Sequence, residues 1–430
     1  MSYKSIKGTV DLLPSAYRAD GVPVASTVQW LAAEARIRSV FAQFDIAEIR
    51  TPILEPTALI ARGVGQLTDI VSKEMFAFER GETHYVLRPE MTAPVMRAYM
   101  QHHLDQQGGL QRLGYIGPCF RAERPQRGRY RQFHQFGVEL IGSEGPLADV
   151  ETISVMMAIY RAFGIERMTL RLNNLGDAAA RPAYRSALQA YLAPYEAELS
   201  DTSRQRLAQN PLRILDTKIP REREIIADAP KLASFIEGEA KDHFDAVCHH
   251  LSALGVSYVL DPLLVRGLDY YGRTAFELES PDLGAQSALA GGGRYDGLSQ
   301  DLGAKKPIPA VGFAAGLERL LLVLDELDQL PRADRPLDVM LVGFGEGAAD
   351  WLVATAQQLR EAGFSVGYDA HVRSLKAQMR EAGRRNPTWV VISGADERAA
   401  GTVGLKHMAR SEQVDIPVTQ LIARLSVDVS

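Results

Sequence analysis

The sequence has few of the features that mark specialised classes of protein. Its 430 residues include only two cysteines, Cys119 and Cys248, which are too few for a disulfide framework and lack the paired spacing of a zinc site. No run of about 18 apolar residues occurs, and the first residues lack a signal-peptide core, so we expect a cytoplasmic protein without a membrane span. The formal net charge of -5 excludes a basic field over the whole chain and leaves nucleic-acid contact to local patches.

Histidines near Cys248 do not point to a metal. His249 and His250 follow this cysteine directly and His243 precedes it, within a segment that we expect to be helical. Adjacent residues of a helix point in different directions. We therefore predict no metal-binding residues.

The segment from Gly117 to Gly142 holds the densest polar chemistry. Aromatic and branched residues fill its ends, whereas 124–131 is polar and contains proline and glycine, which predicts two antiparallel strands joined by a long loop. Side chains alternate between the faces of a strand. Alternation places Arg121 and Glu123 on one face of the first strand. On the second strand the polar face carries Phe133, Gln135, Gly137 and Glu139, and the apolar face carries Phe136, Val138 and Leu140.

Two interpretations fit this hairpin: the floor of a polar ligand site, or a solvated sheet face with ordinary cross-strand ion pairs. The connecting loop favours the ligand site. It carries Arg124, Arg127, Arg129 and Arg131, with Glu123 as the nearby carboxylate. Such crowding is repulsive unless a polyanion neutralises it.

The N-terminal third contains a second candidate for ligand contact. Apolar residues at helical spacing predict a helix over Val28 to Phe44, and a strand interrupted by a proline is predicted over Ile46 to Leu54. A short strand from Tyr85 to Leu87 then leads to Glu90 and Thr92. Their oxygens can accept from a ligand ammonium group or cap the following helix, and the two roles are compatible.

Beyond the hairpin the chain changes character. Residues 174–250 are polar and helical in texture with several prolines, and we assign no chemistry to them. An apolar strand is then predicted to end at Arg266, followed by a turn that carries Tyr270 and Tyr271. Ala290 to Leu298 contains three consecutive glycines, which allow a backbone to approach a ligand closely or form a flexible turn.

Ala310 to Leu324 predicts a short strand that passes through Gly316 into an apolar helix. Arg319 then lies in the first turns of that helix, where the helix dipole disfavours a cation. An anionic partner explains this placement, because a helix N-terminus and a guanidinium both attract phosphate.

The C-terminal part reads as a separate unit. Residues 326–337 predict a linker, and 338–430 alternate strands with helices as in a small α/β domain. A helix that begins near Ser374 carries a cationic stripe, which indicates either a solvated face or contact with phosphates. The stripe consists of Lys376, Arg380 and Arg384.

Several of these segments resemble the motifs of the class II aminoacyl-tRNA synthetases, in the form found in the histidyl-tRNA synthetases. The hairpin is similar to motif 2, the helix and strand before it to motif 1, and Ala310 to Leu324 to motif 3. Residues 87–92, Leu-Arg-Pro-Glu-Met-Thr, resemble the amino-acid-binding loop, in which the family usually has glycine at the place of Met91. Residues 266–271, Arg-Gly-Leu-Asp-Tyr-Tyr, and 290–298, Ala-Gly-Gly-Gly-Arg-Tyr-Asp-Gly-Leu, are similar to two histidyl signatures.

The resemblance covers nearly the whole chain and implies a fold and a domain order. The fold is of the α/β class, with an α+β catalytic domain whose antiparallel sheet is flanked by helices. Residues 1–325 would form this catalytic domain, with a helical insertion at 174–250. Residues 326–337 would link it to an α/β anticodon-binding domain at 338–430.

The resemblance also implies an activity. L-histidine would react with ATP, assisted by Mg2+, to give histidyl-adenylate and pyrophosphate, and histidine would then pass to the 3' end of tRNA(His). A homodimer is expected through motif 1. The alternatives are a non-catalytic paralogue that serves as regulatory subunit of ATP phosphoribosyltransferase, and a module that senses uncharged tRNA. Both would lose signature residues or the C-terminal domain, which this chain keeps.

Individual residues take roles by the same resemblance. Attack of the histidine carboxylate on the α-phosphorus brings two anions together, which requires fixed cations, and a neutral imidazole presents one donor and one acceptor. The implied catalytic residues are Arg121, Arg266 and Arg319, which bind ATP together with Glu123 and Phe133. The implied histidine-binding residues are Glu90, Thr92, Gln135, Glu139, Tyr270 and Tyr271. The implied tRNA-binding residues are Gln126, Arg131, Lys376, Arg380 and Arg384.

Overall fold

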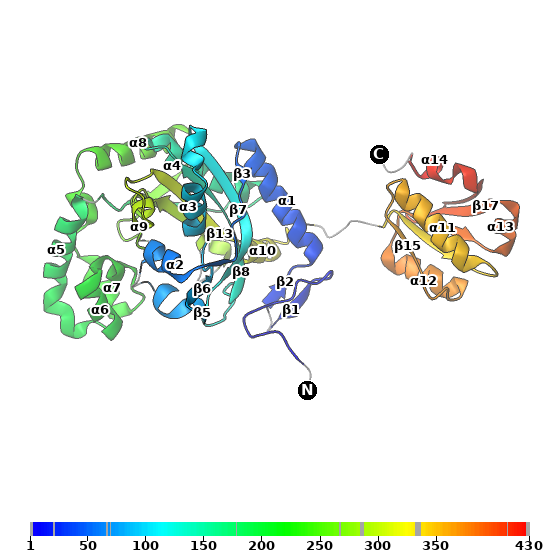
Figure 1. Ribbon diagram of the computed structural model, residues 1–430, viewed down its shortest axis with the longest axis horizontal. Coiled ribbons are helices and arrows are strands. Elements are labelled where there is room, and N and C mark those ends of the chain that lie inside the picture. The colour runs from blue at the N-terminus through cyan, green and yellow to red at the C-terminus, as the bar shows by residue number, and fades with distance from the viewer. Residues whose placement is uncertain are drawn as a thin grey trace. The chain divides into compact units, whose positions relative to one another are not determined.

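The computed structural model describes residues 3–19, 22–65, 68, 70–177, 179–265, 268–283, 288–331, 337–410 and 412–426 (Figure 1). The chain divides into two compact units, Met1–Arg332 and Ala333–Ser430. Among the described residues, no helix has the length and apolarity needed to cross a membrane.

The first unit is built on an eight-stranded sheet, in the order β10-β9-β11-β12-β13-β8-β7-β3. From β9 to β7 every neighbouring pair is antiparallel, whereas β10 and β3 run parallel to their neighbours. The predicted α/β fold with a mainly antiparallel sheet is confirmed. The strands are β3 (Ala47–Glu48), β7 (Gln111–Phe120), β8 (Gln132–Ile141), β9 (Thr169–Asn174), β10 (Tyr258–Leu260), β11 (Gly272–Glu279), β12 (Ala288–Arg294) and β13 (Ala310–Gly316).

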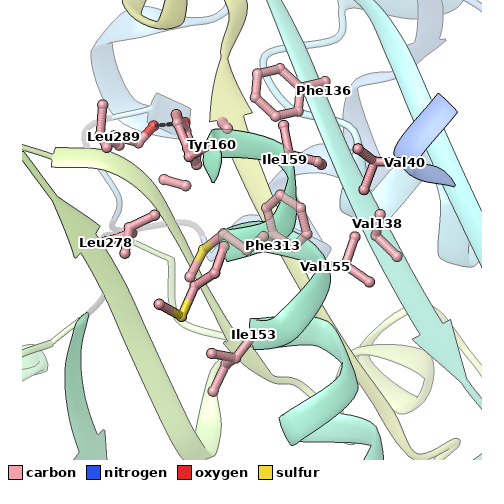
Figure 2. Close-up of a cluster of buried hydrophobic side chains, with 14 of the residues drawn as sticks. Val40, Phe136, Val138, Ile153, Val155, Ile159, Tyr160, Leu278, Leu289 and Phe313 are labelled. Carbon is pink, nitrogen blue, oxygen red and sulfur yellow. Dashed lines mark hydrogen bonds between the residues drawn. The ribbon is translucent and has the colours of Figure 1, made fainter. Parts of the chain in front are cut away.

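One face of this sheet is covered by helices, and the main apolar core lies between them and the strands. The core side chains of β8 are Phe136, Val138 and Leu140, none of which is exposed, so the alternation predicted for the second hairpin strand is confirmed. Figure 2 shows Phe136, Val138 and Phe313 packed with residues of α4, and the Tyr160 hydroxyl donates to the Leu289 carbonyl at 3.0 Å. The covering helices are α1 (Thr27–Gln43), α4 (Pro146–Ala162), α8 (Glu239–Ala253) and α10 (Leu317–Glu326).

The chain between α1 and β7 forms a smaller layer. A three-stranded sheet in the order β4-β6-β5 leads into α3, the helix that begins at Thr92. The strand predicted over Ile46 to Leu54 was wrong, because β3 and β4 belong to different sheets and residues 49–53 bridge between them. The elements of this layer are β4 (Leu54–Pro56), α2 (Thr57–Val64), η1 (Ile70–Glu74), β5 (Phe76–Arg80), β6 (Thr83–Leu87), α3 (Thr92–Gln101) and η2 (Leu104–Gln107). Before α1, β1 (Tyr17–Ala19) and β2 (Val22–Val24) form a separate two-stranded sheet.

The segment after β9 is helical and has an apolar core of its own, which includes Tyr184, Leu188 and Ile214. Its last helix, α8, joins the core of the large sheet instead through Val247 and Leu251. The other elements of this segment are α5 (Ala180–Leu192), η3 (Ala193–Glu198), α6 (Asp201–Gln209), η4 (Pro211–Asp216), α7 (Pro220–Ala227) and η5 (Leu232–Phe235). Later in the chain, η6 (Pro281–Leu283) follows β11 and α9 (Leu298–Asp301) follows β12.

The apolar strand predicted to end at Arg266 was wrong in its described part. Residues 261–265 form a turn after β10, because Pro262 has no N–H to donate and the Asp261 carboxylate accepts the Leu263 N–H at 3.0 Å. The side chain of Asn173 holds the Leu264 carbonyl at 2.9 Å. Arg266 and Gly267 lie outside the described residues.

The second unit is a five-stranded sheet in the order β15-β14-β16-β17-β18. Strands β15, β14 and β16 are parallel, and the antiparallel strands β17 and β18 extend the sheet. The strands are β14 (Val339–Gly343), β15 (Val366–Tyr368), β16 (Trp389–Ser393), β17 (Thr402–His407) and β18 (Glu412–Pro417). The helices are α11 (Ala348–Glu361), α12 (Leu375–Arg385), α13 (Ala395–Ala400), η7 (Val418–Gln420) and α14 (Leu421–Ser426).

Candidate active site

A cavity of about 450 Å³, called here the main cavity, lies over the sheet face opposite the core of Figure 2. Strands β8, β11, β12 and β13 supply its floor, and the β7–β8 loop and α10 supply part of its wall. Its lining includes most residues that the sequence singled out. These are Glu90, Thr92, Arg121, Glu123, Phe133, Gln135, Tyr270, Tyr271 and Arg319.

Arg121 and Glu123 reach the main cavity from a loop. The prediction that they lie on the first strand was wrong, because β7 ends at Phe120 and the Ala122 N–H leaves the hairpin to donate to the Glu74 carbonyl at 2.7 Å. The Arg121 Nε donates to the Pro89 carbonyl at 3.0 Å, and its guanidinium lies 5.1 Å from the centre of the Phe133 ring. The residue thus stands over the hairpin floor with its direction fixed by backbone and ring contacts.

Arg319 lies in the first turn of α10, as the sequence predicted. Its Nη1 donates to the Ala288 carbonyl at 2.9 Å and its Nε to the Gly128 carbonyl at 3.3 Å. Burial lowers the pKa of the Arg319 guanidinium, and the charges of Arg129 and Arg121 lower it further. Several cations therefore converge on one part of the cavity, an arrangement that an anionic ligand would stabilise.

Glu90 and Thr92 form another part of the cavity wall. The Glu90 carboxylate accepts the N–H groups of Thr92 and Ala93 at 2.8 and 2.9 Å, so it caps the start of α3 and also lines the cavity. Burial raises the pKa of the Glu90 carboxyl, and these two N–H groups oppose the rise. The Tyr270 hydroxyl donates to Glu90 at 3.4 Å. This wall offers oxygen acceptors for a cationic group.

Glu139 lies beneath the floor and is not among the residues that line the main cavity. It is fully buried and accepts the hydroxyl protons of Thr92 at 2.7 Å, Tyr115 at 3.1 Å and Tyr295 at 2.5 Å. Burial raises the pKa of Glu139 to about 8, although these hydroxyl groups partly oppose the rise. A Cβ on Gly312 would stand 1.7 Å from Glu139 Oε2, so the neighbouring strand makes room for this carboxylate.

Three tyrosines cluster beside this carboxylate: Tyr295 donates to it, and Tyr270 and Tyr271 line the main cavity. The ring centres of Tyr270 and Tyr271 are 4.6 Å apart, and the Tyr295 ring stands edge-on to both. The sequence analysis missed Tyr115 and Tyr295 as members of the Glu139 network. Tyr295 follows the three glycines of β12, and this position was the available signal.

The three glycines occupy strand β12, so the flexible-turn interpretation was wrong. A Cβ on Gly292 would stand 2.1 Å from the Gly312 carbonyl oxygen, and one on Gly293 would stand 2.6 Å from that of Thr274. Two of the three are therefore required by close packing between strands. Gly291 lines the main cavity.

The helical segment also contributes, although no chemistry was assigned to it from the sequence. Arg206 and Arg213 line the main cavity. The Arg213 Nη2 donates to Asp269 Oδ1 at 3.0 Å, and so does the Asn210 amide. The cavity also includes three carboxylates that sequence reasoning missed, Glu74, Glu277 and Glu318.

The residues expected to bind tRNA are spread over both units. Gln126 is exposed in the β7–β8 loop, and Arg131 is half-buried and donates to the carbonyls of Lys7 and Glu123. Lys376, Arg380 and Arg384 are all exposed on α12. Within the part of the chain that the structure describes, no group of three or more metal-ligating side chains is close enough to share an ion.

The sheet is mainly antiparallel, with helices on one face and the main cavity on the other. The cavity is lined by Arg121 from the motif 2 loop, Arg319 from the motif 3 helix and Glu90 from the amino-acid-binding loop. This combination defines a class II aminoacyl-tRNA synthetase. Comparison with known proteins specifies the class further. The histidyl-tRNA synthetase family model matches residues 24–320, and the anticodon-binding-domain model matches 338–427.

Individual relatives agree with the family models. The chain is 47% identical over 433 residues to the histidine–tRNA ligase of Chloroherpeton thalassium, covering 100% of this chain and 99% of that protein. It is 47% identical to the ligase of Synechococcus sp. strain JA-3-3Ab, with 98% of each covered. The apo Staphylococcus aureus histidyl-tRNA synthetase structure matches 99% of this chain and 100% of its own, at 33% identity and a TM-score of 0.82. The chain belongs to the histidyl-tRNA synthetase family.

Proposed function

We propose that this protein activates L-histidine with ATP and transfers it to the 3' end of tRNA(His). One observation supports the assignment beyond the family: a single cavity combines fixed cations with acceptors for an ammonium group, and a buried carboxylate bonded to tyrosines lies beneath its floor. These are the three kinds of group that a phosphate, an α-amino acid and an imidazole require. Because curated ligases match the chain over its full length, the regulatory-paralogue alternative is not favoured.

In activation, the histidine carboxylate attacks the α-phosphorus and pyrophosphate leaves. We assign Arg121 to the α-phosphate together with Arg266, and Arg319 to the γ-phosphate. The hydrogen bonds of Arg121 and Arg319 to main-chain carbonyls support this role, because cations fixed in advance need little reorganisation in the transition state. Phe133 would stack on adenine, and Glu123 would accept from its exocyclic amine.

Mg2+ is expected as a companion of ATP. This ion is usually held by substrate phosphates and one or two carboxylates with water completing the shell, so a ready-made cluster of ligands is not needed. Glu277 is our candidate because it lines the main cavity and lies opposite Gly291 on the cavity floor. Bound there, the ion would neutralise charge on the polyphosphate.

For selectivity, we assign the imidazole to Glu139 and Tyr271 with Tyr270 adjacent, and the α-ammonium group to Glu90, Thr92 and Gln135. The Thr92 hydroxyl donates to Glu139, so one residue joins the two ends of the amino-acid site. A site that pairs buried polar groups rejects substrates that leave them unpaired, by roughly 10⁴ to 10⁵.

For the transfer step, Gln126 and Arg131 would contact the acceptor end of tRNA(His), and the α12 stripe of Lys376, Arg380 and Arg384 would contact phosphates elsewhere on it. We propose residues 1–325 as the catalytic domain with an insertion at 174–250, 326–337 as a linker and 338–430 as the anticodon-binding domain. A cytoplasmic homodimer is the proposed working state.

Pyrophosphate exchange into ATP with each of the twenty amino acids tests this assignment. We expect exchange with histidine alone, reduced by about 10² or more in Arg121→Ala because a fixed cation is lost. Arg112→Ala is the matched control, since Arg112 lies on β7, the strand that ends just before Arg121, but pairs with Glu151. Folded protein that binds histidine but supports no exchange would overturn the ligase assignment and favour the regulatory paralogue.

A further inference from the structure

Arg88 is a buried arginine to which the preceding sections gave no role. It follows β6 in the segment that carries Glu90, and only 3% of it is exposed. Its guanidinium donates to three main-chain carbonyls and one hydroxyl. The acceptors are Pro118 O at 2.9 Å, Thr51 O at 2.6 Å, Thr51 Oγ1 at 3.0 Å and Pro52 O at 3.2 Å.

The main chain of Arg88 adds two more connections to the same neighbours. Its N–H donates to the Ile53 carbonyl at 2.9 Å, and its carbonyl accepts the Phe120 N–H at 3.0 Å. A Cβ on Gly117 would stand 2.7 Å from Arg88 Nη2, so the hairpin strand makes room for the guanidinium. Arg88 thus joins residues 51–53, 88–90 and 117–120.

This junction stands directly behind two candidate ligand groups. The carbonyl of the next residue, Pro89, accepts Arg121 Nε at 3.0 Å, and the residue after that is Glu90. Glu90 and Arg121 line the main cavity, whereas Arg88 does not. A shift of residues 88–90 would therefore move the ammonium acceptor and the α-phosphate cation together.

Burial of a guanidinium is unfavourable unless its donors are satisfied. Burial lowers the pKa of the Arg88 guanidinium, in keeping with that cost. A methionine of similar length would fill the space without the cost of burying a charged group. Four side-chain hydrogen bonds to two separate segments, 51–52 and 118, are what arginine supplies and an apolar side chain cannot.

We propose that Arg88 is a positioning residue for amino-acid activation, which holds the Glu90 carboxylate and the Arg121 guanidinium together in their places at the main cavity. The inference rests on the proposed function. Arg88 touches neither histidine nor ATP in this account. It acts by holding the groups that do.

The test compares Arg88→Met and Arg88→Lys with the control Arg112→Met, using histidine-dependent pyrophosphate exchange. Misplacement by about 1 Å costs up to about 10² in rate. We therefore expect Arg88→Met to raise the KM for histidine by about tenfold or more and to lower kcat as well. Arg88→Lys keeps the charge but loses the several N–H donors of the guanidinium. Its KM and kcat are expected to lie between those of Arg88→Met and the wild type.

A second readout separates positioning from general stability. Histidine carries the ammonium group that Glu90 would accept, and 3-(imidazol-4-yl)propionate lacks it. The affinity ratio of these two ligands should shrink about tenfold or more in Arg88→Met and stay unchanged in Arg112→Met. If Arg88→Met does not fold, Thr51→Val removes one acceptor and should shift the same ratio by a smaller factor.

The outcomes are distinguishable. Wild-type protein without histidine-dependent exchange would overturn the proposed function itself. Active wild-type protein combined with folded Arg88 variants that keep the wild-type KM, kcat and ligand ratio would overturn this inference alone. A lower Tm with unchanged kinetics would reduce Arg88 to a structural residue and would also overturn it.

Discussion

Arginines serve the main cavity and helix α12 in two different ways. In the cavity, Arg121 and Arg319 donate to main-chain carbonyls at about 3 Å, and their side chains are held in place. On α12, Lys376 and Arg380 are exposed, and Arg384, 75% exposed, pairs with Glu381. A fixed cation in a sheltered site can stabilise charge at one point, whereas exposed cations attract a polyanion over a distance and are screened by salt.

The largest effect should come from removing a fixed cation. Arg319→Ala deletes the guanidinium at the start of α10 and leaves the helix dipole alone to face the ligand. We expect histidine-dependent pyrophosphate exchange to fall by about 10² to 10³, as on loss of one preorganised donor. Arg112→Ala should keep the wild-type rate. If the exchange rate of Arg319→Ala falls by less than about threefold, the contrast between the fixed arginines of the cavity and the exposed arginines of α12 would not hold.

The next effect concerns the buried carboxylate. Glu139→Gln keeps the shape but replaces one acceptor oxygen with an amide nitrogen, so one hydroxyl of Thr92, Tyr115 or Tyr295 loses its acceptor. We expect the KM for histidine to rise by about 10 to 10², while the KM for ATP changes little. Equal increases in both constants would argue against a role in amino-acid selectivity.

Glu139 also predicts a pH dependence of stability. Its pKa in the folded protein is raised to about 8 by burial, so between about pH 4.5 and 8 the folded protein holds a proton that the unfolded chain has lost. The Glu139 contribution to the free energy of unfolding therefore decreases as pH rises through this window, by on the order of 1 kcal/mol per pH unit. In denaturant titrations, the free energy of unfolding of Glu139→Gln should increase relative to that of the wild type from pH 5 to pH 8. Parallel profiles would contradict the buried-carboxyl account.

A smaller effect is expected from the exposed stripe. Replacing Lys376, Arg380 and Arg384 together by alanine should raise the KM for tRNA by about tenfold and flatten its dependence on salt, because phosphate contacts release counterions. Pyrophosphate exchange needs no tRNA and should be unaffected. If the salt dependence of aminoacylation is unchanged, these three side chains form a solvated helix face that does not contact tRNA phosphates.

The smallest effect is expected from the exposed ion pair on α12. Arg384→Ala alone breaks an exposed pair with Glu381, and such pairs contribute about 0 to 1 kcal/mol to stability. We expect thermal denaturation within about 1 °C of the wild type. A decrease of several degrees would show that this helix face is part of the fold and not an adaptable surface.

The sequence predicted the parts of this molecule that depend on local pattern. Alternation along β8 separated the core residues from the cavity residues, and the passage from β13 into α10 placed Arg319 correctly. The resemblance named nine residues that the structure gathers in one cavity. Strand ends were less predictable, because Arg121 and Glu123 leave the sheet through a main-chain contact with Glu74 that no local pattern encodes.

What sequence reasoning missed are contacts between distant segments. Tyr295 meets Glu139 across 156 positions, and Arg88 meets Pro118 and Thr51 across 30 and 37. Arg206 and Arg213 come from the polar segment 174–250, which was predicted to be helical and to which no chemistry was assigned. In each case tertiary packing determines which residues meet, and the periodicity of the sequence does not predict these contacts.

The close approach of Gly312 to Glu139 has a consequence for redesign. The two positions face each other in the β13–β8 ladder, and the space that a Cβ at 312 would take is filled by the Glu139 carboxylate. A larger residue at 312 would evict that carboxylate, and a shorter residue at 139 would leave a void beside unpaired hydroxyls. A substitution at either position alone would therefore disturb the other. Libraries that seek a new amino-acid preference should vary positions 312 and 139 together.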